Sequence, residues 1–352
     1  MPSPIVVYGS YGYTGQLIVD ECKTKGIDVI LSGRSKEALQ KQSLLTGFPF
    51  EVVDIHDAAG LCRLLEKGAM VIHAAGPFQF TAQLMAEACF ITQRHYTDIT
   101  GEIAVFEMMA KLDEKAKATA ITLMPGVGFD VVPSDCLALH LKNRLPSATH
   151  LQLAFASNKG GLSRGTSKTM VEGMGLGGAI RRNGKIIPVP LHEGITEINY
   201  GAFQLPSVRI PWGDVSTAFH STGIGNIEVF RGADKGLIKQ VKMSRYLNWL
   251  LRMRAVKNYL IKQVDKKPAG PNEERRAKSK MFLWGKVWDG QQEKISLLET
   301  IEGYTLTAKT SVLIAQKILS GNVKAGFQTP SKAYGPDLIM EIRGSSRTDL
   351  VS

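Results

Sequence analysis

Short apolar runs alternate with longer amphipathic stretches over the first 125 residues of this 352-residue chain. Runs such as Ile5-Val6-Val7-Tyr8 are apolar at every position, which is typical of strands buried on both faces of a parallel sheet. The pattern predicts strands over 5–8, 29–32, 51–53, 70–74, 95–98 and 120–124, and helices over 16–25, 36–45, 58–66, 82–92 and 104–118. Regular alternation of this kind predicts an α/β fold, a Rossmann doubly wound parallel sheet.

The alternation ends at the glycine- and proline-containing segment 125–130. A helix is predicted from Pro133 to about Leu145, and then a strand over 151–156, a helix over 166–174 and short segments separated by prolines. This pattern indicates a second, α+β domain. We expect domains over residues 1–130 and 131–304, and a C-terminal segment over 305–345, with a helix at 306–319, that returns to the Rossmann domain.

The composition is that of a soluble globular protein, with 44% hydrophobic and 21% charged residues. No signal peptide and no apolar run of about 18 residues is present, so we expect a cytoplasmic protein. The seven histidines have no metal-ligand spacing, so no metal site is predicted. The four cysteines have no paired spacing and are interpreted as buried small hydrophobes in a reducing compartment: Cys22, Cys62, Cys89 and Cys136.

The net charge of +11 is concentrated in residues 236–267, which carry nine Lys or Arg against the single acid Asp265. Apolar residues at helical spacing, Trp249, Met253, Val256, Leu260 and Val264, predict one basic amphipathic helix over this segment. Two interpretations stay open: a docking helix with a solvated basic face, and peripheral contact with an anionic membrane. Nucleic acid is not an expected partner, because the charge is confined to one segment without a recognition motif. A homodimer is compatible with the sequence.

Three glycines lie between the first predicted strand and the first predicted helix. At such a junction a dinucleotide pyrophosphate rests on backbone amides at the helix N-terminus. We therefore expect cofactor binding by Gly9, Ser10, Tyr11, Gly12, Tyr13, Thr14 and Gly15. The GxxGxxG spacing is weak evidence alone and is commoner among extended dehydrogenases than the GxGxxG fingerprint.

Two further strand ends extend the predicted cofactor site. Arg34 and Ser35 follow the second strand, where an NAD enzyme usually has an acidic residue. A cation and a hydroxyl at that place suit a 2′-phosphate, so the predicted cofactor is NADP. After the fourth strand, a turn that contains small residues lets the nicotinamide side of the cofactor approach the backbone. The cofactor-binding residues expected there are Ala75, Gly76, Pro77 and Phe78. A plain Gly-Pro turn without a cofactor role is the alternative.

Carboxylates and a hydroxyl follow the fifth and sixth strands at Asp98, Glu102, Asp130, Ser134 and Asp135. Strand ends of this kind line the ligand crevice of open α/β sheets. Helix capping is the competing explanation: Thr100 or Ser134 would only satisfy unpaired amides at a helix start, and Asp135 would favour a helix N-terminus. Asp98, Glu102 and Asp130 are the candidates for proton delivery or substrate hydrogen bonding.

These strings together resemble the saccharopine dehydrogenase-like oxidoreductases, which include bacterial trans-acting enoyl reductases. The resemblance rests on 9–15, 33–35, 76–78, 96–102, 128–130, 133–135, 165–167, 211–214, 302–304 and 329–330. It implies a Rossmann domain, a second α+β domain and NADP. A substrate with several carboxylates would need several arginines, and those available are Arg164, Arg181, Arg182 and Arg209.

Two functional hypotheses follow. The first is an NADP-dependent oxidoreductase that transfers hydride between NADPH and a C=C, C=O or C=N bond. The basic amphipathic segment favours a small-molecule substrate that is lipid-like or carrier-bound, as in the enoyl reductase branch of the resemblance. The second is a non-catalytic NADP-binding protein, either a membrane-associated scaffold or a redox sensor.

Overall fold

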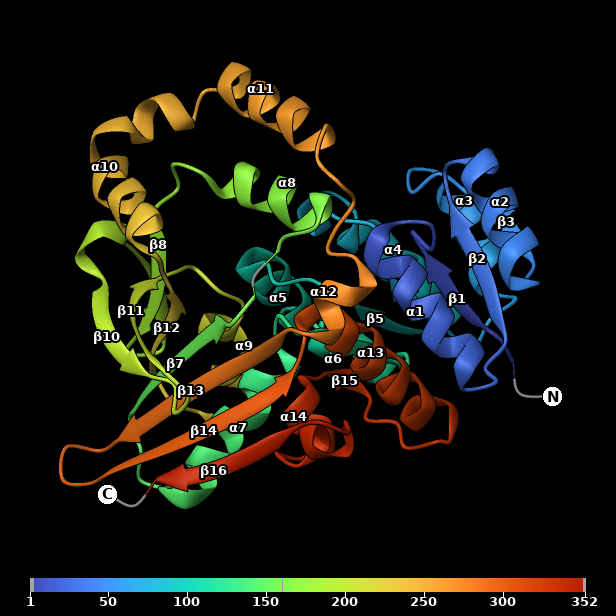
Figure 1. Ribbon diagram of the computed structural model, residues 1–352. Helices are drawn as coiled ribbons and strands as arrows, with labels where there is room; N and C mark the ends of the chain where they lie inside the picture. Colours follow the sequence, from blue (N-terminus) through green and yellow to red (C-terminus); the bar gives the residue numbers. More distant parts are fainter. Residues whose placement is uncertain (1–2, 160, 351–352) are drawn as a thin grey trace. The chain divides into compact units, whose positions relative to one another are not determined.

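The computed structural model describes residues 3–159 and 161–350, apart from the side chains at positions 244, 245 and 247 (Figure 1). The chain forms two compact units. Unit 1 contains the residues up to Val132 together with Tyr304–Ala333. Unit 2 contains Pro133–Gly303 and the residues from Tyr334 onward. The segment 305–345, expected to return to the first domain, is therefore divided: residues up to Ala333 belong to unit 1, and those from Tyr334 onward belong to unit 2.

Unit 1 contains a seven-stranded sheet in the order β15-β6-β5-β4-β1-β2-β3, with every neighbouring pair parallel. This confirms the predicted Rossmann sheet. The elements of unit 1 are β1 (Ile5–Tyr8), α1 (Tyr13–Thr24), β2 (Val29–Gly33), α2 (Lys36–Thr46), β3 (Phe50–Val52), α3 (Ala58–Leu65), β4 (Met70–His73), η1 (Phe78–Phe80), α4 (Ala82–Thr92), β5 (His95–Asp98), α5 (Ile103–Ala110), α6 (Asp113–Ala118), β6 (Thr122–Met124), α13 (Gly303–Leu319), β15 (Gly326–Phe327) and α14 (Pro330–Tyr334).

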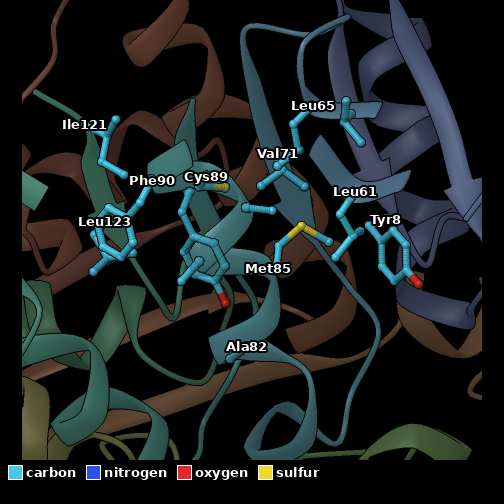
Figure 2. Close-up of a cluster of buried hydrophobic side chains, with 14 of the residues drawn as sticks. Tyr8, Leu61, Leu65, Val71, Ala82, Met85, Cys89, Phe90, Ile121 and Leu123 are labelled. Atoms are coloured by element: carbon cyan, nitrogen blue, oxygen red, sulfur yellow. The ribbon is translucent and has the colours of Figure 1, made fainter. Parts of the chain in front are cut away.

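Alternate strand residues of unit 1 face opposite sides of the sheet, as a period of two requires. Val6 and Val71 belong to a buried cluster with α3 and α4 side chains, parts of which are drawn in Figure 2. Met85 and Phe90 of α4 lie in this cluster and are 0% and 5% exposed. Apolar side chains thus cover most of β1, β2 and β4, which explains their largely apolar sequences, whereas Ser32, His73, Thr97 and Asp98 are buried polar residues near the strand ends.

Unit 2 contains a mixed nine-stranded sheet in which β10-β11-β12-β7-β13-β14-β16 form the main path, and β8 pairs with β12 and β9. β7 and β12 are parallel, and the other pairs are antiparallel. This is the predicted α+β domain. Its elements are α7 (Val132–Arg144), β7 (His150–Ser157), α8 (Arg164–Gly173), β8 (Gly178–Arg182), β9 (Lys185–Val189), η2 (Leu191–Glu193), β10 (Ile195–Asn199), β11 (Gln204–Arg209), α9 (Asp214–Thr222), β12 (Asn226–Gly232), α10 (Lys235–Leu251), α11 (Arg254–Asp265), α12 (Glu273–Ala277), β13 (Lys280–Trp288), β14 (Glu293–Ile301), η3 (Leu338–Glu341) and β16 (Ser346–Leu350).

Two predicted helices are each divided in the structure. The stretch 104–118 forms α5 and α6, and the basic segment 236–267 forms α10 and α11, so the prediction of one basic helix was wrong. Met253 at the second break has extended backbone angles, φ −66° and ψ 128°. Neither glycine nor proline lies at this break, but the Arg252 guanidinium donates to the Gly175 carbonyl at 2.8 Å. A tertiary contact, rather than a local signal, accompanies the turn of the chain.

No helix of the described ranges is long and apolar enough to cross a membrane. The four cysteines are free, and three of them are buried, while Cys62 is partly exposed.

Candidate functional site: a nucleotide loop and the ends of five parallel strands

The glycine loop connects β1 to α1 and leaves the N-terminus of the helix open. Gly9 has a left-handed backbone, φ +83°, and its N–H donates to the Ser32 carbonyl of β2 at 2.7 Å. Gly12 is the N-cap of α1, and no side chain of the described residues caps this helix end. The first amides of a helix lack partners within the helix, so an uncapped end can accept an anion.

Close packing explains why glycine is needed at two positions of the loop. A Cβ atom on Gly15 would lie 2.3 Å from the Gly9 carbonyl oxygen, and one on Gly9 would lie 2.9 Å from the backbone nitrogen of Ala75. The loop therefore packs closely against the first turn of α1 and against the segment after β4. Because β1 lies between β4 and β2 in the sheet, the loop also marks the point where the strand order reverses. Open α/β sheets bind dinucleotides at such a point.

Other side chains of the loop hold it in place. The buried Ser10 hydroxyl donates to Oε1 of Gln42 at 2.7 Å, and Nε2 of Gln42 donates back to the Ser10 carbonyl at 2.9 Å. The Tyr13 ring packs edge-on against Tyr304 at 5.1 Å. Thr14 lies in the first turn of α1 and is partly exposed. Ser10 can thus offer its backbone to a cofactor, while its side chain is committed to α2.

At the end of β2 the structure brings Tyr11, Arg34 and Ser35 together. The Ser35 amide donates to the Tyr11 hydroxyl at 3.3 Å, and the Ser35 hydroxyl oxygen accepts from the Ala38 amide as the N-cap of α2. The exposed Arg34 side chain follows directly after β2. Arg34 therefore supplies a solvent-exposed cation next to Ser35, whose amide contacts Tyr11 of the glycine loop. The Ser35 hydroxyl oxygen accepts from the α2 amide, and the hydroxyl proton of Ser35 can still be donated to a ligand.

The segment after β4 is fixed from two directions. Its Gly76–Pro77 bond is cis, and the Thr81 hydroxyl donates to the Ala75 carbonyl at 3.0 Å. Phe78 is buried and packs edge-on against the His73 ring at 5.3 Å. This segment therefore lies beside the glycine loop, and Ala74 and Ala75 are the residues of it nearest to Gly9.

Asp98, at the end of β5, is fully buried and accepts three hydrogen bonds. Its Oδ1 accepts from the amides of Thr100 and Gly126 at 2.9 and 2.8 Å, and its Oδ2 accepts from the Tyr96 hydroxyl at 2.6 Å. Burial raises the pKa of Asp98 to about 6, against the lowering effect of these donors. The side chain ties the ends of β5 and β6 together, so its oxygens are engaged inside the domain.

Glu102 is engaged in a similar way. Its two oxygens accept from the consecutive amides of Phe78 and Gln79 at 2.9 and 2.8 Å. Burial raises the pKa of Glu102, and the two amides lower it. The carboxylate therefore binds the first two amides of η1 and holds the segment after β4 in place.

Asp130 differs from both. Its carboxyl group makes no hydrogen bond to the described residues, and the side chain is partly exposed. Desolvation raises the pKa of Asp130 to about 7. A Cβ atom on Gly101, in the loop after β5, would lie 3.0 Å from Oδ2 of Asp130. This carboxyl group therefore sits where the ends of β5 and β6 meet.

The remaining two candidates belong to unit 2. Ser134 and Asp135 lie in the first turn of α7, and Oδ1 of the buried Asp135 accepts from the Ser221 hydroxyl of α9. Asp135 thus joins two helices of its own unit.

Sequence reasoning missed the residues that support the Asp130 loop, residues 125–130, from 178 and 183 positions further along the chain. The Thr307 hydroxyl of α13 accepts from the Phe129 amide at 2.9 Å, and the Thr310 hydroxyl donates to the Val127 carbonyl at 2.7 Å. A Cβ atom on Gly128 would also lie only 2.8 Å from the methyl carbon of Thr307. Two threonines on a predicted helix carry no signal of such a role, because only the return of α13 to the sheet creates the contact.

Comparison with known proteins agrees with this geometry. Residues 5–124 match the model of the saccharopine dehydrogenase NADP binding domain. A human saccharopine dehydrogenase-like oxidoreductase is 29% identical over 218 residues, which cover 54% of this chain and 51% of the relative. A trans-acting enoyl reductase of Mycobacterium leprae is 30% identical over 149 residues, covering 40% of this chain and 36% of that protein.

The likeness in fold extends over both units. Apo saccharopine dehydrogenase (L-Glu forming) from Saccharomyces cerevisiae matches with a TM-score of 0.70 at 14% identity, covering 99% of this chain and 100% of that one. The sequence match spans about half the length of the curated relatives. The glycine loop, the steric need for Gly9 and Gly15 and the cation at Arg34 fit NADP, the cofactor of the matched domain. Residues 5–124 thus form an NADP-binding domain of the saccharopine dehydrogenase type, and the chain is similar to saccharopine dehydrogenase-like oxidoreductases.

Proposed function

We propose that the protein is an NADP-dependent reductase that transfers hydride between NADPH and a C=C, C=O or C=N bond of a lipid-like or carrier-bound substrate. The observation that carries this proposal is the contrast among the three carboxylates. Asp98 and Glu102 are occupied by donors of their own domain, whereas Asp130 offers a carboxyl group with a pKa of about 7 at the ends of β5 and β6. A group that titrates near neutral pH is suited to general acid–base catalysis.

NADPH supplies the hydride when it is bound. In reduction of a double bond, one atom of that bond receives the hydride pair, and the other needs a proton. Asp130 is the residue that we assign to that proton, because its protonated form is populated at neutral pH. In the reverse direction, the Asp130 carboxylate would accept the proton from the substrate. Asp98 and Glu102 act as positioning residues, since Asp98 fixes the backbone after β6 that leads to Asp130, and Glu102 fixes the backbone after β4.

The arginines of unit 2 bear on the class of substrate. A polycarboxylate would need several free arginines, but Arg209 pairs with Glu228 at 2.8 Å. Arg181 is buried and donates to the carbonyls of Val215 and Gly184 at 2.9 and 2.7 Å. Two of the four candidates are thus part of the framework. The similarity to a trans-acting enoyl reductase supports a C=C bond of an acyl substrate as the first acceptor to test.

Single-turnover oxidation of NADPH against enal, enoyl thioester, ketone and imine acceptors tests the reaction class. With an active acceptor, Asp130→Asn should lower the rate about 10²–10⁴-fold, the range for loss of a general acid, while NADPH affinity stays unchanged. The wild-type rate of reduction should fall as the pH rises through about 7, and the variant should lose that decline. The exposed Asp28→Asn substitution in the same unit is the matched control. A D130N variant with the wild-type pH profile would contradict the assignment.

The alternative is an NADP-binding scaffold or redox sensor without turnover. It shares the glycine loop but does not need Asp130. NADPH binding without oxidation by any acceptor of the panel would favour this alternative and overturn the enzyme proposal.

A further inference from the structure

Large exposed apolar side chains gather on one segment of unit 2. Five of the fifteen exposed large hydrophobic residues in the described part of the chain lie between positions 243 and 259: Met243, Tyr246, Trp249, Met253 and Tyr259. Trp249 is 68% exposed and Tyr246 is 64% exposed. Met253, at the break between α10 and α11, is 46% exposed. Clusters of this kind mark interaction surfaces.

Other residues of α10 and α11 attach this segment to the rest of unit 2. Val241 of α10 is buried against Val208 and Ala233. On α11, the buried Lys257 donates to the Glu172 carbonyl of α8, and Arg254 donates to both oxygens of the Glu172 carboxylate at 3.0 and 2.9 Å. Val241, Arg254 and Lys257 therefore attach α10 and α11 to their own unit.

The exposed face of α10 is both basic and apolar. At 100° per residue, five of its positions fall within about a third of the helix circumference, on the side away from Val241. These positions are Lys239, Lys242, Met243, Tyr246 and Trp249. A helix face that mixes lysine with aromatic side chains has the composition of a helix that lies in a lipid interface.

The cations of this segment are available. Six exposed lysines have no carboxylate within salt-bridge distance among the described residues: Lys235, Lys239, Lys242, Lys262, Lys266 and Lys267. They flank the exposed aromatic residues along the chain from both ends. Each lysine near an anionic surface adds an attraction that salt screens.

We propose that α10 and α11 dock the protein on an anionic phospholipid surface. Tyr246, Trp249 and Met253 enter the boundary between headgroups and acyl chains, and the six lysines lie among the phosphates. Charge complementarity selects this occupant, because the six cations suit a surface with many negative groups. The proposal is independent of the catalytic assignment, since it needs neither NADP nor Asp130.

Vesicle flotation tests the proposal with the full chain. We expect the wild-type protein to float with vesicles of phosphatidylcholine and phosphatidylserine, but not with phosphatidylcholine alone, and to be released by high salt. The triple variant Lys239→Glu, Lys242→Glu, Lys262→Glu should bind at least about a hundredfold more weakly. The matched control reverses the charge of two exposed lysines of unit 1, with the substitutions Lys23→Glu and Lys25→Glu, and should bind the vesicles like wild type. Arg254 and Lys257 are left intact, because their replacement would detach α11 from α8.

Insertion is read from tryptophan fluorescence. Trp249 is one of four tryptophans, and its emission should shift to shorter wavelength on the anionic vesicles, whereas Trp249→Phe should lose that shift. Unchanged circular dichroism and NADPH affinity in every variant would show that the fold is intact. Vesicle binding that the triple variant retains would overturn the proposal, as would no binding at all. Full competition by soluble glycerophosphoserine would also overturn it, because a soluble headgroup would then be the ligand.

Discussion

Replacing Gly15 by alanine tests the nucleotide loop most directly. The new Cβ would start 2.3 Å from the Gly9 carbonyl oxygen, and real Cβ atoms essentially never come within 3.0 Å. The loop must therefore open by about 0.7 Å or more at this point. The Gly9 carbonyl also accepts from the Gly12 amide at 3.0 Å, so the displacement reaches the N-cap of α1.

The expected loss follows from the amides that such a shift would misalign. Hydrogen bonds to a charged group contribute about 1.5–3 kcal/mol each, so misaligning two pyrophosphate contacts costs about 3–6 kcal/mol. This corresponds to roughly 10²–10⁴-fold weaker NADPH binding. Overpacking should lower the free energy of unfolding by about 1–3 kcal/mol at the same time.

Fluorescence titration with NADPH measures the affinity, and urea unfolding measures the stability. Gly173→Ala is the matched control, because a Cβ there meets nothing within 4 Å and the residue ends α8 of unit 2. That control should bind NADPH like wild type. A folded Gly15→Ala protein with unchanged NADPH affinity would refute the placement of the pyrophosphate on this loop.

Three further predictions concern unit 1. Arg34→Ala should weaken NADPH about 10–100-fold without affecting NADH, because only NADPH has the 2′-phosphate; wild-type protein that binds both equally in a titration would exclude this role. Tyr96→Phe removes the 2.6 Å hydrogen bond to Asp98, so the free energy of unfolding should fall by about 1–2 kcal/mol, and an unchanged urea midpoint would contradict this. Burial lowers the pKa of His73 to about 3, so below the ordinary value of 6.5 the unfolded chain binds a proton that the folded chain does not. This contribution to stability is complete above pH 6.5 and is lost toward pH 3 by up to about 1.4 kcal/mol per pH unit. His73→Leu should reduce that slope, which urea midpoints over this pH range would reveal.

The sequence alone determined the framework of unit 1 because its signals are local. Strand and helix periods over the first 125 residues, together with Gly9, Gly12 and Gly15, predicted the parallel sheet and the cofactor loop. A strand buried on both faces has to be apolar, and a helix end that accepts phosphate has to lack bulk. These requirements act within a few neighbouring residues, so they can be recognised without the fold.

Only the tertiary structure distinguished residues that look alike in the sequence. Asp98, Glu102 and Asp130 all follow strands, but the donors that engage the first two include the amides of Gly126 and Phe78, which lie on other segments. Thr307 reaches the Asp130 loop only because α13 returns to unit 1. The division of the basic segment at Arg252 likewise involves the distant Gly175. Contacts between residues tens to hundreds of positions apart leave no periodic trace in a single sequence, so the fold decides which carboxyl group and which aromatic residues remain available.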